Sequence, residues 1–534
     1  MRKILKYLLL SVSVIVLGSC EDFFDINTDP NNPTTTTPDL LLTNAELGIV
    51  NSLGMGTSGF SSYLGVYMHQ VTRRQSFDAY ITTGNDFAIT QAWTNLYSIA
   101  LEDLREVIRI ATEEEAWHYV GVAEILKAYA YSNMVDVWAD IPFSEANTTP
   151  ADYTPQLDED ADIYPQLFSM LDAGVEKLEM ESSSSPEADD LIYGGDLNKW
   201  RKAAKTIKLK LYSQLRLVQD VSSEVNALLA EGDLISNMSE DFEMAYVNTQ
   251  SPENRHPGYI ADYATSNRTF YISIWFYEIL TGQNPDILTN ITDPRVPYYF
   301  YNQLADGAPA ENPEEYRDGD FVSIYFGSTG PNQAGQQDRS QTITGLYPTG
   351  GRYDDGLGGA ATPTSGPADI AQRLLPYFTR LFIEAELAHT GVIGGDARGL
   401  LEQAIQASFD KVNSLVENYS VQGQAPPPEI SQEDIDEYIA AVLAAYDAGD
   451  ADRRLEIIMT QKWIASFGYS VDQYNDYRRT GYPVLYDPNT DNIPFTNASL
   501  NFPTTLPYSA TEVELNPNVT QKNPREVKVF WDVD

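Results

Sequence analysis

The single cysteine is the residue whose chemistry is easiest to assign. Cys20 is the only cysteine among 534 residues, so no intramolecular disulfide is open to it. It closes the tetrapeptide Leu-Gly-Ser-Cys at residues 17–20, the pattern at which bacterial lipoproteins take a diacylglyceryl group on the thiol. Three basic residues and the apolar run 7–17, which is too short to span a bilayer as a helix, precede it. The sequence predicts a lipoprotein signal peptide over residues 1–19 and a lipid anchor on Cys20.

Ligand binding is the second chemistry that the residue types suggest. Aromatic rings and hydrogen-bonding groups mix in two expected loop segments, residues 73–93 and a glycine-rich part of residues 237–370, where glycine lets the backbone carry rings outward. The predicted ligand-binding residues are Arg74, Asp78, Tyr80, Asn85, Trp93, Tyr325, Phe326, Tyr347 and Tyr353. The alternative is that these rings are packed, as most tyrosines and tryptophans are. It is strongest for Trp93, which with Tyr97 also fits a buried helix face.

Motifs for catalysis are weak or missing in the sequence. Gly54, Gly56 and Gly59 match a dinucleotide-loop spacing, but no strand is expected before them, so chance accounts for the match. The sequence has no Walker loop, no His-Glu-x-x-His and no Gly-x-Ser-x-Gly motif. No catalytic residue is predicted. A surface glycoside hydrolase stays an alternative, because it needs only two well-placed carboxylates and the chain has 77 acidic residues.

Metal-binding patterns are equally incomplete. The four histidines lie far apart in the sequence. Residues 25–29 (Asp-x-Asn-x-Asp) match the start of a calcium loop, but Pro30 stands where that loop needs glycine and Thr36 where it needs a bidentate glutamate. No metal site and no cofactor is predicted, and a structural calcium ion is left open.

Composition excludes some classes of partner. The formal net charge is −43, from 34 basic and 77 acidic residues. Such a surface repels phosphate backbones, so nucleic acid is not expected as a partner. Hydrophobic residues make up 43% of the chain, which is enough for a large buried core.

Helices are expected to position the loops. Apolar residues at helical spacing predict a mainly α fold, in which four tetratricopeptide-like hairpins form a scaffold by covering each other's apolar faces. The expected hairpins span about 90–138, 160–219, 376–418 and 431–468. A large loop-rich ligand region, about 237–370, is inserted between the second and third pairs. The remaining divisions are a lipidated tether over residues 20–38, a single domain over 39–534 and a C-terminal loop region over 469–534.

One predicted helix, residues 198–219, has two distinct faces. Trp200, Ala204, Ile207, Leu211, Leu215 and Val218 recur at helical spacing, and the other face carries Arg201, Lys202, Lys205, Lys208 and Lys210. In so acidic a chain, a solvated or salt-bridged face is a simpler interpretation than a binding patch.

Several segments, taken in order, resemble one known family. They are residues 20–23 (Cys-Glu-Asp-Phe), Trp93 with Tyr97, 139–146 (Ala-Asp-Ile-Pro-Phe-Ser-Glu-Ala), 200–211, 293–295 (Asp-Pro-Arg), 462–465 (Lys-Trp-Ile-Ala) and 478–483 (Arg-Arg-Thr-Gly-Tyr-Pro). Over nearly its whole length the chain resembles the SusD/RagB family of outer-membrane nutrient-binding lipoproteins, close to the SusD-like branch. It departs from the family near residues 506–508, where Thr505 and Ser509 replace the usual Arg and Pro.

The resemblance implies a role as well as the scaffold described above. A lipoprotein of this family would sit in the outer membrane, anchored through Cys20 and facing the cell exterior. Its partner would be a SusC-type TonB-dependent transporter, to which it passes nutrients, and it would have no catalytic activity. Oligosaccharides are the expected ligands, because aromatic faces stack on sugar rings and polar side chains bind the hydroxyls. A peptide-binding member of the same family stays an alternative.

Overall fold

Helices dominate the computed structural model, which describes residues 36–74, 80–148, 154–265, 267–332, 337–421, 423–490 and 500–533. Cys20, Asp78 and the calcium-like segment 25–29 lie outside these ranges. The prediction of a mainly α fold is confirmed, since the strands are all short. Within the described ranges, no helix is both long and apolar enough to cross a membrane.

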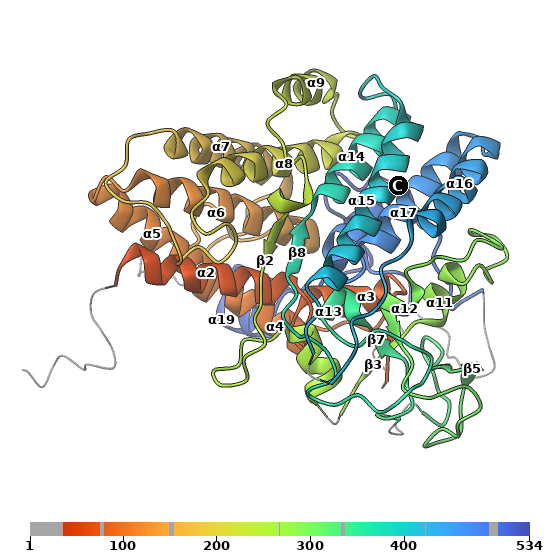
Figure 1. Cartoon of the computed structure of the whole chain (residues 1–534). Coiled ribbons are helices and arrows are strands. Elements are labelled where there is room, and N and C mark those ends of the chain that lie inside the picture. Colours follow the sequence, from red (N-terminus) through yellow and green to blue (C-terminus); the bar gives the residue numbers. More distant parts are fainter. Residues whose placement is uncertain are drawn as a thin grey trace, which may run out of the picture.

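Most helices of the N-terminal half form one packed group, while α3 lies toward the C-terminal helices (Figure 1). The elements of this half are α2 (Pro38–Leu53), α3 (Phe60–Tyr67), α4 (Phe87–Thr94), the π-helical η2 (Asn95–Leu101), α5 (Glu102–Glu113), α6 (Trp117–Trp138), α7 (Asp160–Leu178), α8 (Leu197–Leu215) and α9 (Ser222–Glu231). Helix α6 packs against both α5 and α7, and α7 packs against α8. Because α6 has neighbours on several sides, most of its residues are buried.

Helix α8 illustrates how the sequence forms these elements. Asp196 caps its N-terminus, since the carboxylate accepts hydrogen bonds from the N–H groups of Asn198 and Lys199. The apolar face from Trp200 to Leu215 is buried, whereas Val218 lies beyond the helix and is exposed. The basic face is salt-bridged, as predicted: the partners are Asp233 for Arg201 and Lys205, Glu240 for Lys202, Asp172 for Lys208 and Asp472 for Lys210.

A second group of helices follows the middle of the chain. Its elements are α14 (Tyr377–His389), α15 (Ala397–Glu417), α16 (Gln432–Ala448), α17 (Ala451–Ala465) and α18 (Ser470–Thr480). Helix α14 packs against α15 and α17 and also against α8, which joins the two groups. Helix α18 lies in the region predicted as C-terminal loops, so that prediction is wrong for these residues: α18 is buried against α3 and α6.

The middle of the chain builds a loop-rich layer with little sheet, visible at the lower right of Figure 1. Four antiparallel pairs join β1 (Val71–Arg73) to β3 (Phe270–Ile272), β2 (Phe242–Met244) to β8 (Gln372–Leu375), β4 (Phe300–Tyr301) to β7 (Ile343–Thr344) and β5 (Tyr316–Asp318) to β6 (Phe321–Ser323). Short helical segments lie between them: η3 (Met238–Glu240), α10 (Pro257–Tyr259), η4 (Ile260–Ala264), α11 (Ile274–Leu280), α12 (Val296–Tyr299) and α13 (Leu346–Thr349). Since β1 comes from the N-terminal half, its pairing with β3 brings residues 71–73 to this layer.

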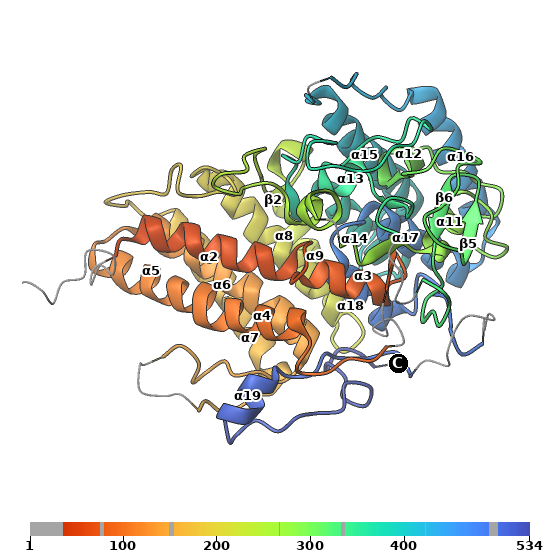
Figure 2. The same ribbon diagram turned by 90° about the horizontal axis from the view of Figure 1, so that it is seen from below.

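The C-terminal segment crosses back to the first helices. Helix α19 (Ala510–Leu515) lies near α4, apart from α14–α17 (Figure 2). The N–H of Ala510 donates to the carbonyl of Gly84 at 2.8 Å, and the indole of Trp93 donates to Glu512 at 3.2 Å. The end of the chain therefore supports the loop that leads into α4.

Candidate ligand-binding site

A cavity of about 630 Å³ lies where α3, α4, β1 and β3 meet. We call it the Phe87 cavity; its lining includes Tyr63, Arg73, Ile81, Asn85, Phe87 and Phe270. The pairing of β1 with β3 sets Arg73 opposite Phe270, and the guanidinium lies 5.5 Å from the centre of that ring. This size and this mixture of rings and polar groups are typical of small-molecule sites.

The start of α4 supplies the most accessible ring. Phe87 is 60% exposed, while Ala88, Ile89 and Ala92 on the opposite side of the helix are buried. Asp86 fixes the turn before it, because its carboxylate accepts hydrogen bonds from the N–H of Thr83 at 2.9 Å and the hydroxyl of Tyr63 at 3.1 Å. These hydrogen bonds therefore fix the backbone that carries the ring of Phe87.

Glycine at position 59 is required by the close approach of the chain beside the cavity. A Cβ at Gly59 would lie 2.1 Å from the carbonyl oxygen of Gly54. The segment from Gly54 to Gly59 joins α2 to α3, so a helix and not a strand comes immediately before it, which supports a chance match to the dinucleotide-loop spacing.

Asn267 forms another wall of the cavity, and a hydrogen bond from Arg74 fixes its position. The guanidinium of Arg74 donates to its side-chain oxygen at 2.5 Å, and the backbone N–H of Arg74 donates to the carbonyl of Thr269 at 2.9 Å. Arg74 is 3% exposed. The predicted ligand-binding residue Arg74 thus lies beneath this wall as a support, and not on the surface of the cavity.

The other residues predicted to bind ligand in segment 73–93 lie in different environments. Asn85 is exposed and lines the Phe87 cavity. Tyr80 is buried and shares a hydrogen bond of 2.7 Å with the ring nitrogen Nε2 of His69. Trp93 is 5% exposed and packs against Tyr97 and Trp138, so its assignment as an exposed ligand contact is wrong and the helix-face alternative holds.

The glycine-rich segment packs inward more than predicted. Tyr347 is 1% exposed, its hydroxyl donates to the carbonyl of Ala465 at 2.7 Å, and its ring stacks on Tyr299. The expectation of an outward-facing ring is wrong here. The reason lies in the neighbouring glycine: a Cβ at Gly345 would lie 2.4 Å from the carbonyl oxygen of Tyr298, so this glycine permits close packing.

The other three predicted rings of this segment do not join the cavity. Phe326 is buried against Tyr80 with the ring centres 5.0 Å apart, so the structure brings together two predicted residues, but as core. Tyr325 and Tyr353 are half-buried, beside Tyr316 and Tyr298 respectively, and neither lines the Phe87 cavity. Their role in ligand binding stays a prediction.

Sequence reasoning missed Phe87 and Ile81, although a signal for Phe87 was present. The apolar spacing Ala88, Ile89, Ala92 defines the inner face of α4, and Phe87 falls on the other side. A large ring off the buried face of a helix is a candidate contact residue. Phe270 and Asn267 gave no such signal, because only the pairing of β1 with β3 brings their segment to this place.

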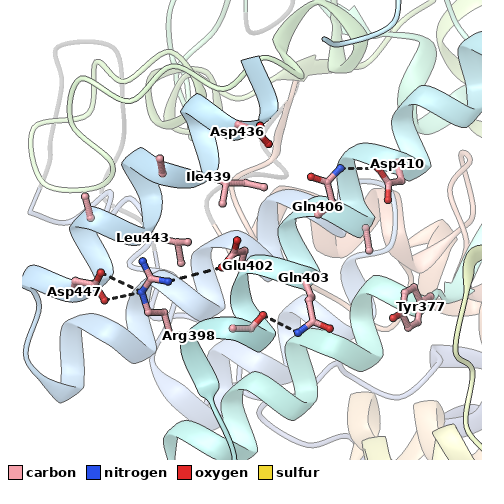
Figure 3. Close-up of a pocket in the computed structure, with 14 residues that line it drawn as sticks. Tyr377, Arg398, Glu402, Gln403, Gln406, Asp410, Asp436, Ile439, Leu443 and Asp447 are labelled. Carbon is pink, nitrogen blue, oxygen red and sulfur yellow. Dashed lines mark hydrogen bonds and ion pairs between the residues drawn. The ribbon is translucent and has the colours of Figure 1, made fainter. Parts of the chain in front are cut away.

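A second groove, of about 970 Å³, lies on α15 and α16 (Figure 3). Arg398 reaches across it to Asp447 at 2.9 Å and also pairs with Glu402, and Gln406 donates to Asp410 at 2.8 Å. These groups satisfy one another, and the only ring in the lining is Tyr377. The Phe87 cavity is therefore the better candidate for a sugar or peptide ligand.

Among the described residues, two buried histidines are uncharged and the His, Cys, Asp and Glu side chains form no metal site. Burial lowers the pKa of His69 to about 3 and that of His256 to about 3, so both imidazoles are neutral at physiological pH. In the described part of the chain, no group of three His, Cys, Asp or Glu residues could hold a metal ion.

Comparison with known proteins identifies the family. Residues 30–508 match the SusD-like 2 family, described as "Starch-binding associating with outer membrane". None of the curated proteins matches the chain.

Solved structures show the same fold. A chitin-binding protein has 22% identity and a TM-score of 0.68, over 93% of this chain and 100% of its own. A SusD/RagB family protein from Bacteroides thetaiotaomicron has 19% identity and a TM-score of 0.69, over 93% and 99%. A chitin-binding SusD homologue from Flavobacterium johnsoniae has 18% identity and a TM-score of 0.65, over 92% and 99%. The chain belongs to the SusD-like family and is a nutrient-binding protein of the outer membrane, not an enzyme.

Proposed function

We propose that this protein captures oligosaccharides in the Phe87 cavity and delivers them to a SusC-type TonB-dependent transporter. The observation that carries the proposal is the exposed ring of Phe87, which lines the same cavity as Asn85. A ring stacks on the C–H face of a sugar, and an amide both donates to and accepts from its hydroxyls. Two structural relatives described as chitin-binding support a glycan as the ligand class.

Charge supports an uncharged ligand over an anionic one. The chain carries a net charge of −43, which repels anions at long range, whereas a neutral sugar meets no such barrier. Peptides remain the competing ligand class within the family.

Delivery requires a membrane anchor and a transporter. We place the anchor on a lipid attached to Cys20, with the protein at the cell exterior. The packed pairs α5–α6, α7–α8, α14–α15 and α16–α17 would form the tetratricopeptide-like scaffold, whose broad rigid face would dock on the transporter. Mild detergent extraction and pull-down on a tagged protein should recover the transporter, and recovery of the protein alone in every detergent would count against this partner.

Calorimetry tests the ligand class. The Cys20→Ala variant, which lacks the lipid acceptor, is titrated with chito-, gluco- and xylo-oligosaccharides and with short neutral peptides. We expect one glycan series to bind, and Phe87→Ala to weaken that binding at least about tenfold, a loss of about 1.4 kcal/mol. The exposed Leu357→Ala on another loop is the matched control and should bind normally. Binding of peptides alone would contradict the proposal.

A further inference from the structure

A larger cavity adjoins the Phe87 cavity. It measures about 1070 Å³ and is lined by residues of four segments, among them Arg268, Glu311, Asp338, Arg339 and Thr362. We call it the Arg339 cavity. Thr265 and Asn267 line both cavities, so one wall is common to the two.

The common wall and the floor beyond it are held in place by buried arginines. Asn267 accepts a hydrogen bond from Arg74, as described above. Arg268 is buried, and its guanidinium donates to the carbonyl oxygens of Asp262, Asp338 and Ala361. One side chain thereby ties together three of the four segments that form the Arg339 cavity. A preformed surface lowers the ordering cost of binding an extended ligand.

The charges in the two linings balance, although the protein is strongly acidic. The cationic residues are Arg73, Arg268 and Arg339, and the anionic residues are Asp86, Glu311 and Asp338. Over the whole chain, acidic residues outnumber basic ones by 77 to 34. The three carboxylates already accept backbone hydrogen bonds, from Thr83, Arg339 and Arg268. The two linings therefore have no excess charge of either sign that would attract an anionic or a cationic ligand.

Resting on the proposed function, we infer that the site is a continuous two-cavity groove for a linear, uncharged oligosaccharide. One end stacks at Phe87, the middle crosses Asn267, and the other end lies in the Arg339 cavity. Amides and hydroxyls of Asn85, Asn267, Asn312 and Thr362 line this path and are suited to sugar hydroxyls. A disaccharide fills only the first cavity, so affinity should rise with chain length.

The experiment uses a length series from disaccharide to hexasaccharide of the glycan that binds. Titrations compare the Cys20→Ala protein with the same protein carrying Arg339→Ala, Phe87→Ala or the control Arg398→Ala. Arg339 is exposed and its backbone hydrogen bond to Glu311 survives the substitution. The control Arg398→Ala removes the same charge from a distant surface, on α15. We expect Arg339→Ala to weaken hexasaccharide binding at least fivefold and to leave disaccharide binding unchanged, Phe87→Ala to weaken both, and Arg398→Ala to change neither.

Other outcomes separate the two claims. If the hexasaccharide binds no more tightly than the disaccharide, and Arg339→Ala has no effect while Phe87→Ala does, the two-cavity groove is refuted and the proposed function stands. If no oligosaccharide binds, the proposed function fails and the groove with it. A uronic-acid hexasaccharide should bind at least tenfold more weakly than its neutral counterpart, and equal binding would overturn the assignment of an uncharged ligand.

Discussion

At the scale of single residues, burial distinguishes rings that hold the fold from rings that are free to meet a ligand. Phe87 and Tyr347 are both aromatic residues of segments that were expected to be loops, yet the first is 60% exposed and the second 1%. The sequence around each contains glycine, asparagine or aspartate, so composition alone does not separate them. What separates them is long-range contact, such as the hydrogen bond from Tyr347 to Ala465.

Tyr347→Ala should therefore destabilise the protein. Removal of a fully buried aromatic side chain costs about 3–5 kcal/mol, and the variant also leaves the carbonyl of Ala465 without its donor. Urea unfolding followed by tryptophan fluorescence gives the free energy of unfolding. Tyr325→Ala, which removes a half-buried ring from the same segment, is the control and should cost clearly less. Equal stability of Tyr347→Ala and wild type would contradict the observed packing.

Asp262 should make stability depend on pH. Burial raises the pKa of this carboxyl from 3.8 to about 6. Because the folded carboxyl holds its proton more tightly than the unfolded one, its contribution is complete below pH 3.8 and is lost as the pH rises through about 6. The difference corresponds to about 3 kcal/mol.

The test is the change in the free energy of unfolding between pH 4 and pH 7. In Asp262→Asn, which does not titrate but keeps an oxygen for the hydroxyl of Thr344, the loss of stability over this interval should be smaller by up to about 3 kcal/mol. The exposed Asp306→Asn serves as control. An unchanged pH dependence in Asp262→Asn would show that this carboxyl is not the titrating group.

At the scale of elements, local patterns predicted most helices, and long-range contacts decided the rest. The expected boundaries near 160, 376 and 431 correspond to α7, α14 and α16, because each has a long apolar face and a clear start. Helix α18 was missed because it is rich in polar residues, and Asp472, Asn475 and Arg479 are buried there only through partners on other elements. The pairing of β1 with β3 could not be predicted, because strands of this length are too short to show an alternating sequence pattern. Half of the candidate site depends on this pairing.

The joint between α14, α18 and α8 depends on one buried carboxylate. Burial alone would raise the pKa of Glu386, but Arg479 and Arg216 outweigh it and hold that pKa below its ordinary value. Both guanidinium groups donate to Glu386, and all three side chains are nearly inaccessible. Breaking such a buried pair by removing one partner is strongly destabilising, because it leaves an uncompensated charge.

Arg479→Met should lower the free energy of unfolding by about 3–5 kcal/mol. Arg398→Ala removes an exposed ion pair and should cost no more than about 1 kcal/mol. Denaturant titration of both variants measures the difference, and the double variant Glu386→Leu, Arg479→Met should cost less than the sum of its two single changes. A small effect of Arg479→Met would mean that the joint is held by apolar packing instead.

At the scale of the whole molecule, two groups of helices hold a loop-rich layer that carries both cavities. The family follows from sequence alone because its motifs are spread in order over residues 20–483, and the match over residues 30–508 confirms it. The site does not follow in the same way. It is assembled from residues near 60, 85 and 270, which come together only in the folded chain.

Attachment to the membrane belongs to this scale too, and Cys20→Ala should abolish it. Each buried CH₂ of an acyl chain contributes about 0.8 kcal/mol, and stable anchoring takes more than one chain. Fractionation followed by a salt and carbonate wash should find the variant outside the membrane pellet and the wild type within it. A variant that stays with the membrane would show that another contact anchors the protein.

The most direct test of the central claim is a crystal structure of the protein with its bound oligosaccharide. We predict a sugar ring stacked on Phe87, with hydroxyls within hydrogen-bonding distance of Asn85 and Asn267. Density for the sugar in the groove between α15 and α16, or against Tyr325 and Tyr353 with the Phe87 cavity empty, would contradict the account.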